Sequence, residues 1–200
     1  MPSRPLFVTQ FYEGWIDDPA LIAELAHSCR SLARDDAAGK RWCKANGYAG
    51  YTSYASLDDL PARDPAFADL KRHLDRHARS FAAEACLEME GRKPKLDSLW
   101  VNVLKSGGAH SGHIHPHSII SGTVYIEVPE GAGALKLEDP RLPMLMHAPG
   151  RTAEAPEAMQ TFVYAQPAVG TIFLWESWLR HEVVANQAKA ERISISFNFS

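Results

Sequence analysis

The second half of the chain is divided into short runs of β-branched and aromatic residues, separated by Gly, Pro, Asn and Asp. Many short strands at regular spacing are typical of a β-sandwich or barrel. The predicted strands span 99–104, 119–128, 134–137, 161–165, 171–175, 181–184 and 192–199. This half therefore predicts a mainly β protein whose strands form two packed layers or a closed barrel.

The first half carries two predicted helices. Asp18 followed by Pro19, and Asp64 followed by Pro65, are typical helix starts, since Asp caps the first turn and Pro fits the first helical position. Apolar residues then recur every three to four positions, and the second helix is expected to stop near Gly91. Each helix has one apolar face, so we expect both to pack on the outside of the β layers.

The remaining segments complete a single predicted domain. We expect a strand over 5–15, and a loop over 35–57 that leads into a short strand at 51–55. No repeat or linker divides the 200 residues. Residues 1–95 are therefore expected to provide helical support and outer strands, and residues 96–200 the β core with its site.

Composition excludes several classes of function. A net charge of −3 and a pI of about 6.3 leave no basic surface for nucleic acid, so a small molecule or peptide is the expected partner. No apolar run is long enough for a signal segment or a membrane span, so we expect a soluble, cytoplasmic protein. Three cysteines without CxxC spacing argue against disulfides and against a thiolate zinc site.

Three histidines form a candidate metal site. His113 and His115 are two positions apart, so both side chains lie on one face of an extended chain, and His181 follows far downstream. Imidazole suits iron, zinc, copper and nickel, so the ligands alone do not select the metal. His115 and His117 have the same spacing; we favour His113 with His115 because Pro116 should end the strand.

The last predicted strand alternates between two kinds of residue. Its polar set can be explained by an edge strand with one face in water. If His181 instead sits on a nearby strand and points into a barrel, this polar face can line the same interior, where the Arg192 guanidinium can bind a carboxylate. Ile193, Ile195, Phe197 and Phe199 face one way, and Arg192, Ser194, Ser196 and Asn198 face the other.

Two stretches resemble the 2-oxoglutarate- and Fe(II)-dependent oxygenases, in particular a group of small bacterial members. They read HIHPHSIISGTVYI from His113 to Ile126 and WESWLRHEVVANQAKAERISISFN from Trp175 to Asn198. The resemblance implies a cupin-like jelly roll, or double-stranded β-helix, with flanking helices. It covers the C-terminal half, and the first ninety residues are expected to add little beyond helical support.

The resemblance also implies roles for the site residues. His113 and His181 would bind Fe(II), while Arg192 and Ser194 would hold the far carboxylate of 2-oxoglutarate. The family's usual second ligand is Asp or Glu, and this chain has His115 there, which leaves the iron one unit more positive. Two weaker candidates for contact with 2-oxoglutarate are Asn102 and Tyr125. Asn102 could equally be an ordinary polar residue of a strand, and Tyr125 a core residue with a bonded hydroxyl.

The implied activity is hydroxylation of an unidentified small molecule or peptide by dioxygen, with release of succinate and CO2. One alternative is a cupin-type metalloenzyme without 2-oxoglutarate, although the Glu usual in cupins is missing from 116–120. Another is a non-catalytic jelly-roll binding module. Only the oxygenase requires Arg192 and Ser194 as a carboxylate clamp. The proline-rich segment 139–160 is expected to form a lid or binding loop, and the sequence leaves a homodimer open.

Overall fold

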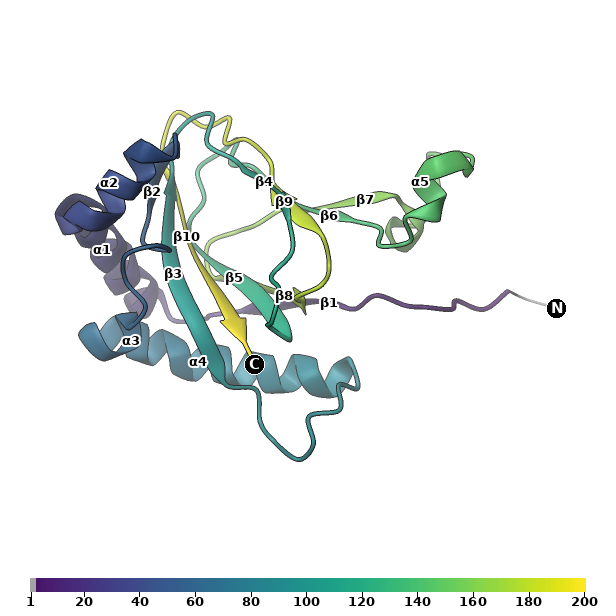
Figure 1. Cartoon of the computed structure of the whole chain (residues 1–200), viewed down its shortest axis with the longest axis horizontal. Helices are drawn as coiled ribbons and strands as arrows, with labels where there is room; N and C mark the ends of the chain where they lie inside the picture. Colours follow the sequence, from purple (N-terminus) through teal and green to yellow (C-terminus); the bar gives the residue numbers. More distant parts are fainter. Residues whose placement is uncertain (1–2) are drawn as a thin grey trace.

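The computed structural model describes residues 3–200 and consists of two antiparallel β-sheets with helices on one outer face (Figure 1). The larger sheet contains β1 (Phe11–Trp15), β8 (Thr171–Glu176), β5 (Ile120–Glu127), β10 (Arg192–Phe199), β3 (Leu96–Leu104) and β2 (Gly50–Thr52), in that order. The smaller sheet contains β4 (His110–His113), β9 (His181–Val183), β6 (Leu135–Glu138) and β7 (Phe162–Ala165). This arrangement is the jelly roll that was expected.

Five helices and one 3-10 turn complete the described chain. They are α1 (Pro19–Asp35), α2 (Ala37–Ala45), α3 (Leu60–Arg63), α4 (Pro65–Glu84), α5 (Pro143–His147) and η1 (Glu157–Met159). Helices α1 to α4 lie on the side of the larger sheet that faces away from the smaller one (Figure 1). No helix within residues 3–200 has the length and hydropathy needed to span a bilayer.

The alternation along β10 decides which side chains reach the interior. Ile193, Ile195, Phe197 and Phe199 are fully buried in the main core, together with the inner faces of α1 and α4. The residues between them project into the space between the sheets, as expected from the period of two along a strand. Burying the apolar face of β10 under the helices therefore fixes its polar face as a wall of the interior.

Three predicted boundaries were wrong. The strand expected at 5–15 is limited to β1, since only these residues pair with β8. The expected loop 35–57 contains α2, which Asp36 caps by accepting hydrogen bonds from the backbone N–H groups of Ala38 and Gly39. Helix α4 ends before Gly91, because Cys86 adopts a left-handed φ of 54° and closes the last turn.

The proline-rich segment between β6 and β7 projects away from the sheets with α5 (Figure 1). None of the side chains that line the interior cavity comes from residues 139–160. The role expected for this segment in closing over the site or choosing a substrate is therefore not supported by the arrangement of the described chain.

Candidate metal and anion site

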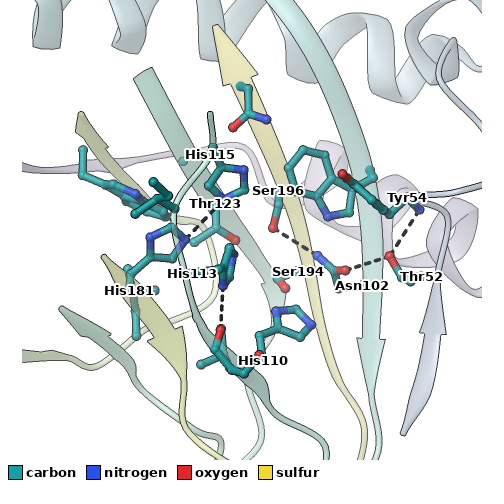
Figure 2. A pocket seen from close by; sticks show the side chains of 18 of the residues that line it. Thr52, Tyr54, Asn102, His110, His113, His115, Thr123, His181, Ser194 and Ser196 are labelled. Atoms are coloured by element: carbon teal, nitrogen blue, oxygen red, sulfur yellow. Dashed lines mark hydrogen bonds between the residues drawn. The ribbon is translucent and has the colours of Figure 1, made fainter. Parts of the chain in front are cut away.

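A cavity of about 560 Å³ lies between the two sheets. Its volume is in the range typical of small-molecule sites. The histidine cluster projects from the smaller sheet, and Asn102, Ser194 and Ser196 face it from β3 and β10 (Figure 2). Arg192 lines the same cavity. The structure thus brings together the two parts of the site that are far apart in the sequence.

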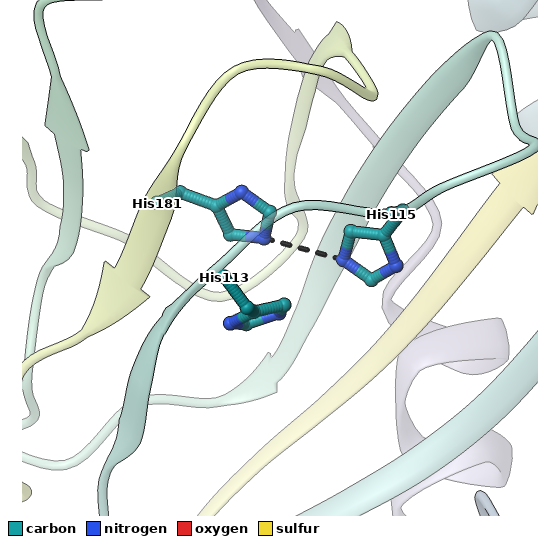
Figure 3. Close-up of side chains that lie close together, drawn as sticks. All are labelled: His113, His115 and His181. Carbon is teal, nitrogen blue, oxygen red and sulfur yellow. Dashed lines mark hydrogen bonds between the residues drawn. The ribbon is translucent and has the colours of Figure 1, made fainter. Parts of the chain in front are cut away.

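The three predicted ligands converge on one point (Figure 3). One nitrogen from each of His113, His115 and His181 lies within 4.8 Å of the others, and the Nε2 atoms of His115 and His181 are 3.3 Å apart. Two nitrogens bound at about 2.1 Å and at right angles about one ion would be roughly 3.0 Å apart. The cluster therefore has nearly the spacing that a single metal ion requires.

Backbone carbonyls orient two of these imidazoles. The Nδ1 atom of His181 is 2.9 Å from the Leu179 carbonyl oxygen, and that of His113 is 2.7 Å from the Ser111 carbonyl oxygen. When Nδ1 donates to a carbonyl, the lone pair is on Nε2, and this is the usual arrangement of a metal-binding histidine. Burial lowers the pKa of His181 to about 3 and of His115 to about 4, so both are neutral at pH 7.

His117, the alternative ligand, lies outside this cluster. It is exposed and has a left-handed φ of 72°, directly after Pro116. The pair His113 and His115 converges instead, because β4 ends at His113 and the chain then turns inward at His115, whose backbone N–H donates to the Ser177 carbonyl. The geometry agrees with the preference for the first pair.

Arg192 is a buried cation without a carboxylate partner in the described chain. Its side chain is 1% exposed; Nη1 donates to the Gly133 carbonyl at 3.0 Å and Nη2 to the Ser194 hydroxyl at 3.4 Å, while Nε has no partner. Burial lowers the pKa of Arg192, yet a guanidinium keeps its proton in proteins. A buried charge is costly unless it is paired, so this position indicates an anionic ligand.

Asn102 and Tyr125 take different positions around this cation. Asn102 lines the cavity, where its Nδ2 donates to Ser196 and its Oδ1 accepts the hydroxyl proton of Thr52. Tyr125 is fully buried, its hydroxyl has no partner, and its ring centroid is 5.3 Å from the Arg192 guanidinium carbon. Both residues are therefore near the predicted anion, Asn102 along the wall and Tyr125 behind Arg192.

The N-terminal half contributes more than helical support, which corrects the expectation for this region. Trp42, Tyr48, Thr52 and Tyr54 line the cavity, and Tyr48 places its hydroxyl 2.7 Å from Nε2 of His110. Pairing of β2 with β3 sets Thr52 opposite Asn102 and so carries this segment to the site. The only local signal was the recurrence of tyrosine at 48, 51 and 54 among glycines.

The fold and the site together define a jelly-roll protein with a three-histidine centre and a buried guanidinium in one cavity. A family model described as "Putative 2OG-Fe(II) oxygenase" matches residues 98–198, which is half of the chain and contains all these residues except those of the N-terminal wall. The chain therefore belongs to this family of 2-oxoglutarate- and Fe(II)-dependent oxygenases. It is accordingly an enzyme rather than a non-catalytic binding module.

Solved structures support the fold. A Pseudomonas putida prolyl-4-hydroxylase is 16% identical, with a TM-score of 0.63 over 96% of this chain and 92% of that one. The epimerase SnoN from nogalamycin biosynthesis, in complex with Fe3+ and alpha ketoglutarate, is 14% identical, with a TM-score of 0.67 over 96% of this chain and 79% of that one. HygX from Streptomyces hygroscopicus, with nickel and 2-oxoglutarate bound, is 13% identical, with a TM-score of 0.58 over 96% of this chain and 82% of that one. A comparison with curated protein sequences finds no match.

Proposed function

We propose that this protein is a hydroxylase that uses Fe(II), 2-oxoglutarate and dioxygen on a small-molecule or peptide substrate. His113, His115 and His181 would hold the ferrous ion, and Arg192 with Ser194 would hold the 5-carboxylate of 2-oxoglutarate. The unpaired Arg192 cation, buried in the same cavity as three converging imidazoles, is the observation that carries this proposal.

The residues fit both groups. Imidazole is a good ligand for iron, and it must be in its neutral form to bind a metal. Burial keeps His115 and His181 in this neutral form by lowering the pKa of each. Arg192 has unused hydrogen-bonding capacity at Nε, and the guanidinium carbon lies 5.3 Å from the centroid of the Tyr125 ring, whose hydroxyl also lacks a partner. This environment fits a carboxylate with several acceptor positions. Asn102 and Tyr125 would complete the pocket from its wall and from behind the guanidinium.

When bound, iron and 2-oxoglutarate would use dioxygen to replace a C–H hydrogen of the substrate by hydroxyl, while 2-oxoglutarate would become succinate and CO2. The residues of this chain bind and orient. Arg192 and Ser194 would hold one end of 2-oxoglutarate, and His113, His115 and His181 would hold the iron in the same cavity. The Trp175 indole, 4.6 Å from the His181 ring, shields that ligand from water.

The proposal is tested by adding Fe(II) and then 2-oxoglutarate to metal-free protein under anaerobic conditions. We expect a visible charge-transfer band in the wild type and its loss in Arg192→Ala at the same 2-oxoglutarate concentration. Arg151→Ala is the matched control, since Arg151 is exposed and does not line the cavity. A wild-type protein that binds Fe(II) but develops no band would contradict the proposal and favour the cupin-type alternative.

A further inference from the structure

The cavity extends beyond the residues that the proposed function assigns to 2-oxoglutarate. Arg192 lies at one end of β10, and Ser196 and Asn198 follow at steps of two residues, so the polar wall continues away from the guanidinium. The ten heavy atoms of 2-oxoglutarate need at most about 300 Å³ at the volume of one water molecule each. Roughly half of the cavity of about 560 Å³ is therefore left for a second molecule.

This second compartment has one apolar wall. Trp100 and Tyr54 pack edge to face with ring centroids 5.3 Å apart, and the Trp100 ring lies 5.8 Å from that of His115. Tyr54 is 64% exposed and Trp100 only 8%, so the pair leads from the rim of the cavity to the metal centre. An apolar body seated against these rings would be held next to the histidines.

Polar groups that mainly donate hydrogen bonds lie beside these rings, since Trp100 is opposite Ser196 in the pairing of β3 with β10. The Asn198 amide uses one N–H on Ser98, and its oxygen accepts from the Ser121 hydroxyl, which leaves its second N–H available. The Ser196 hydroxyl accepts from Asn102, and in the described chain it donates to no protein acceptor. A ligand in this compartment is therefore matched best by groups that accept hydrogen bonds.

The charge of the cavity is not balanced by the protein. Among its lining residues in the described chain there is no Asp, Glu or Lys and a single Arg, Arg192. Three neutral imidazoles leave both charges of a ferrous ion uncompensated, and the two carboxylates of 2-oxoglutarate offset only two of the three positive charges present. One positive charge remains, which attracts an anion and repels a cation at low local dielectric constant.

On the basis of the proposed function, we infer that the substrate is a small organic monoanion. Its carboxylate or similar acidic group would bind the donors on Ser196 and Asn198, and its apolar body would pack against Trp100 and Tyr54. The replacement of the acidic ligand by His115 and the absence of acidic lining residues both favour this class, because each removes a negative charge that would oppose it. A cationic substrate would have no countercharge here.

Three probes with the same ring and different charge test the inference: phenylacetate, phenylacetamide and 2-phenylethylamine. Their dissociation constants are measured by tryptophan fluorescence on protein loaded with Zn(II) and 2-oxoglutarate, so that no turnover occurs. We expect phenylacetate to bind at least tenfold more tightly than the amide, and the amine more weakly than both. Equal affinities, or preference for the amine, would overturn the inference.

A variant pair identifies the compartment. Ser196→Asp places a carboxylate on the donor wall and should reverse the order of phenylacetate and the amine, whereas the neutral control Ser196→Asn should retain the wild-type order. An unchanged order in a folded Ser196→Asp protein would place the anion elsewhere and contradict the inference; if this variant does not fold, the wild-type ranking decides. Wild-type protein that binds 2-oxoglutarate without preferring phenylacetate refutes this inference alone, whereas failure to bind 2-oxoglutarate refutes the proposed function as well.

Discussion

Replacing Arg192 by Met should separate the stability of the protein from its affinity for 2-oxoglutarate. The side chain is 1% exposed and has one good hydrogen bond, to Gly133, and one long one, to Ser194. Removing a buried, unpaired cation relieves a desolvation penalty of several kcal/mol, while losing the hydrogen bonds costs about 1.5–3 kcal/mol. We expect metal-free Arg192→Met to be more stable than wild type by about 2 kcal/mol, or about 4–8 °C in Tm.

The same change should nearly abolish the binding of 2-oxoglutarate. Two charge-assisted hydrogen bonds from the guanidinium to a carboxylate contribute about 1.5–3 kcal/mol each, so the dissociation constant should rise by a factor of roughly 10² to 10⁴. Wild-type protein at a ligand concentration of about 100 times its Kd gains about 2.7 kcal/mol in stability. The variant should gain almost nothing at that concentration.

Urea unfolding with and without 2-oxoglutarate, in the presence of a chelator, measures both effects. The expected result is a reversal: the variant is the more stable protein without ligand, and its advantage disappears with ligand. A variant that is less stable than wild type without ligand would show that the Arg192 cation is already satisfied within the protein. In that case its burial could not be used to infer an anion site.

Three further predictions concern individual residues. His181→Ala should lose bound Fe(II) while His117→Ala retains it, as measured by metal content after desalting; equal retention would contradict the assigned ligand set. Burial lowers the pKa of His110 to about 4, so between about pH 6.5 and 4 the unfolded chain binds a proton that the folded chain excludes. As the pH falls through this range, metal-free protein should lose up to about 1.4 kcal/mol of unfolding free energy per pH unit through this residue. In unfolding experiments, His110→Gln should show a correspondingly shallower dependence of stability on pH. In Gly122→Ala the new Cβ would lie 2.5 Å from side-chain atoms of Leu174 and Phe197, so urea unfolding should show a loss of about 1–3 kcal/mol in stability. The control Gly150→Ala, where no atom lies within 4 Å of the new Cβ, should show almost no loss.

The division of β10 into an apolar and a polar face could be predicted from the sequence because it depends on a local pattern. Alternating residues point to opposite faces of a strand, and a shift by one position would bury Arg192 and Ser194 in the apolar core under the helices. The same reasoning predicted that His113 and His115 lie together, and they do, although β4 ends at His113 and His115 lies in the turn that follows. The local pattern did not decide whether the polar face of β10 lines the interior or faces water, because that depends on which strands pair.

The N-terminal wall of the cavity could not be predicted in this way. Tyr48 reaches His110 and Asn102 only because β2 pairs with β3 across some fifty residues of intervening chain, and this register has no local signature. The end of α4 was missed for a related reason. Cys86, a residue that rarely adopts a left-handed backbone, takes the position where glycine usually marks the end of a helix.

The two halves of the site belong to different sheets, so the packing of the sheets sets the distance between them. The metal-binding histidines are held by β4, β9 and the turn after β4, and their orientation depends on carbonyls of that layer. Arg192, Ser194 and Asn102 are held by the central strands of the larger sheet, where the apolar face of β10 is fully buried. Stacked sheets lie about 10 Å apart, so the metal centre and the donor wall face each other across a gap that the packing of the jelly roll sets. A substrate bound between them would therefore be positioned by the fold, and its charge would be selected by the few polar groups that line the gap.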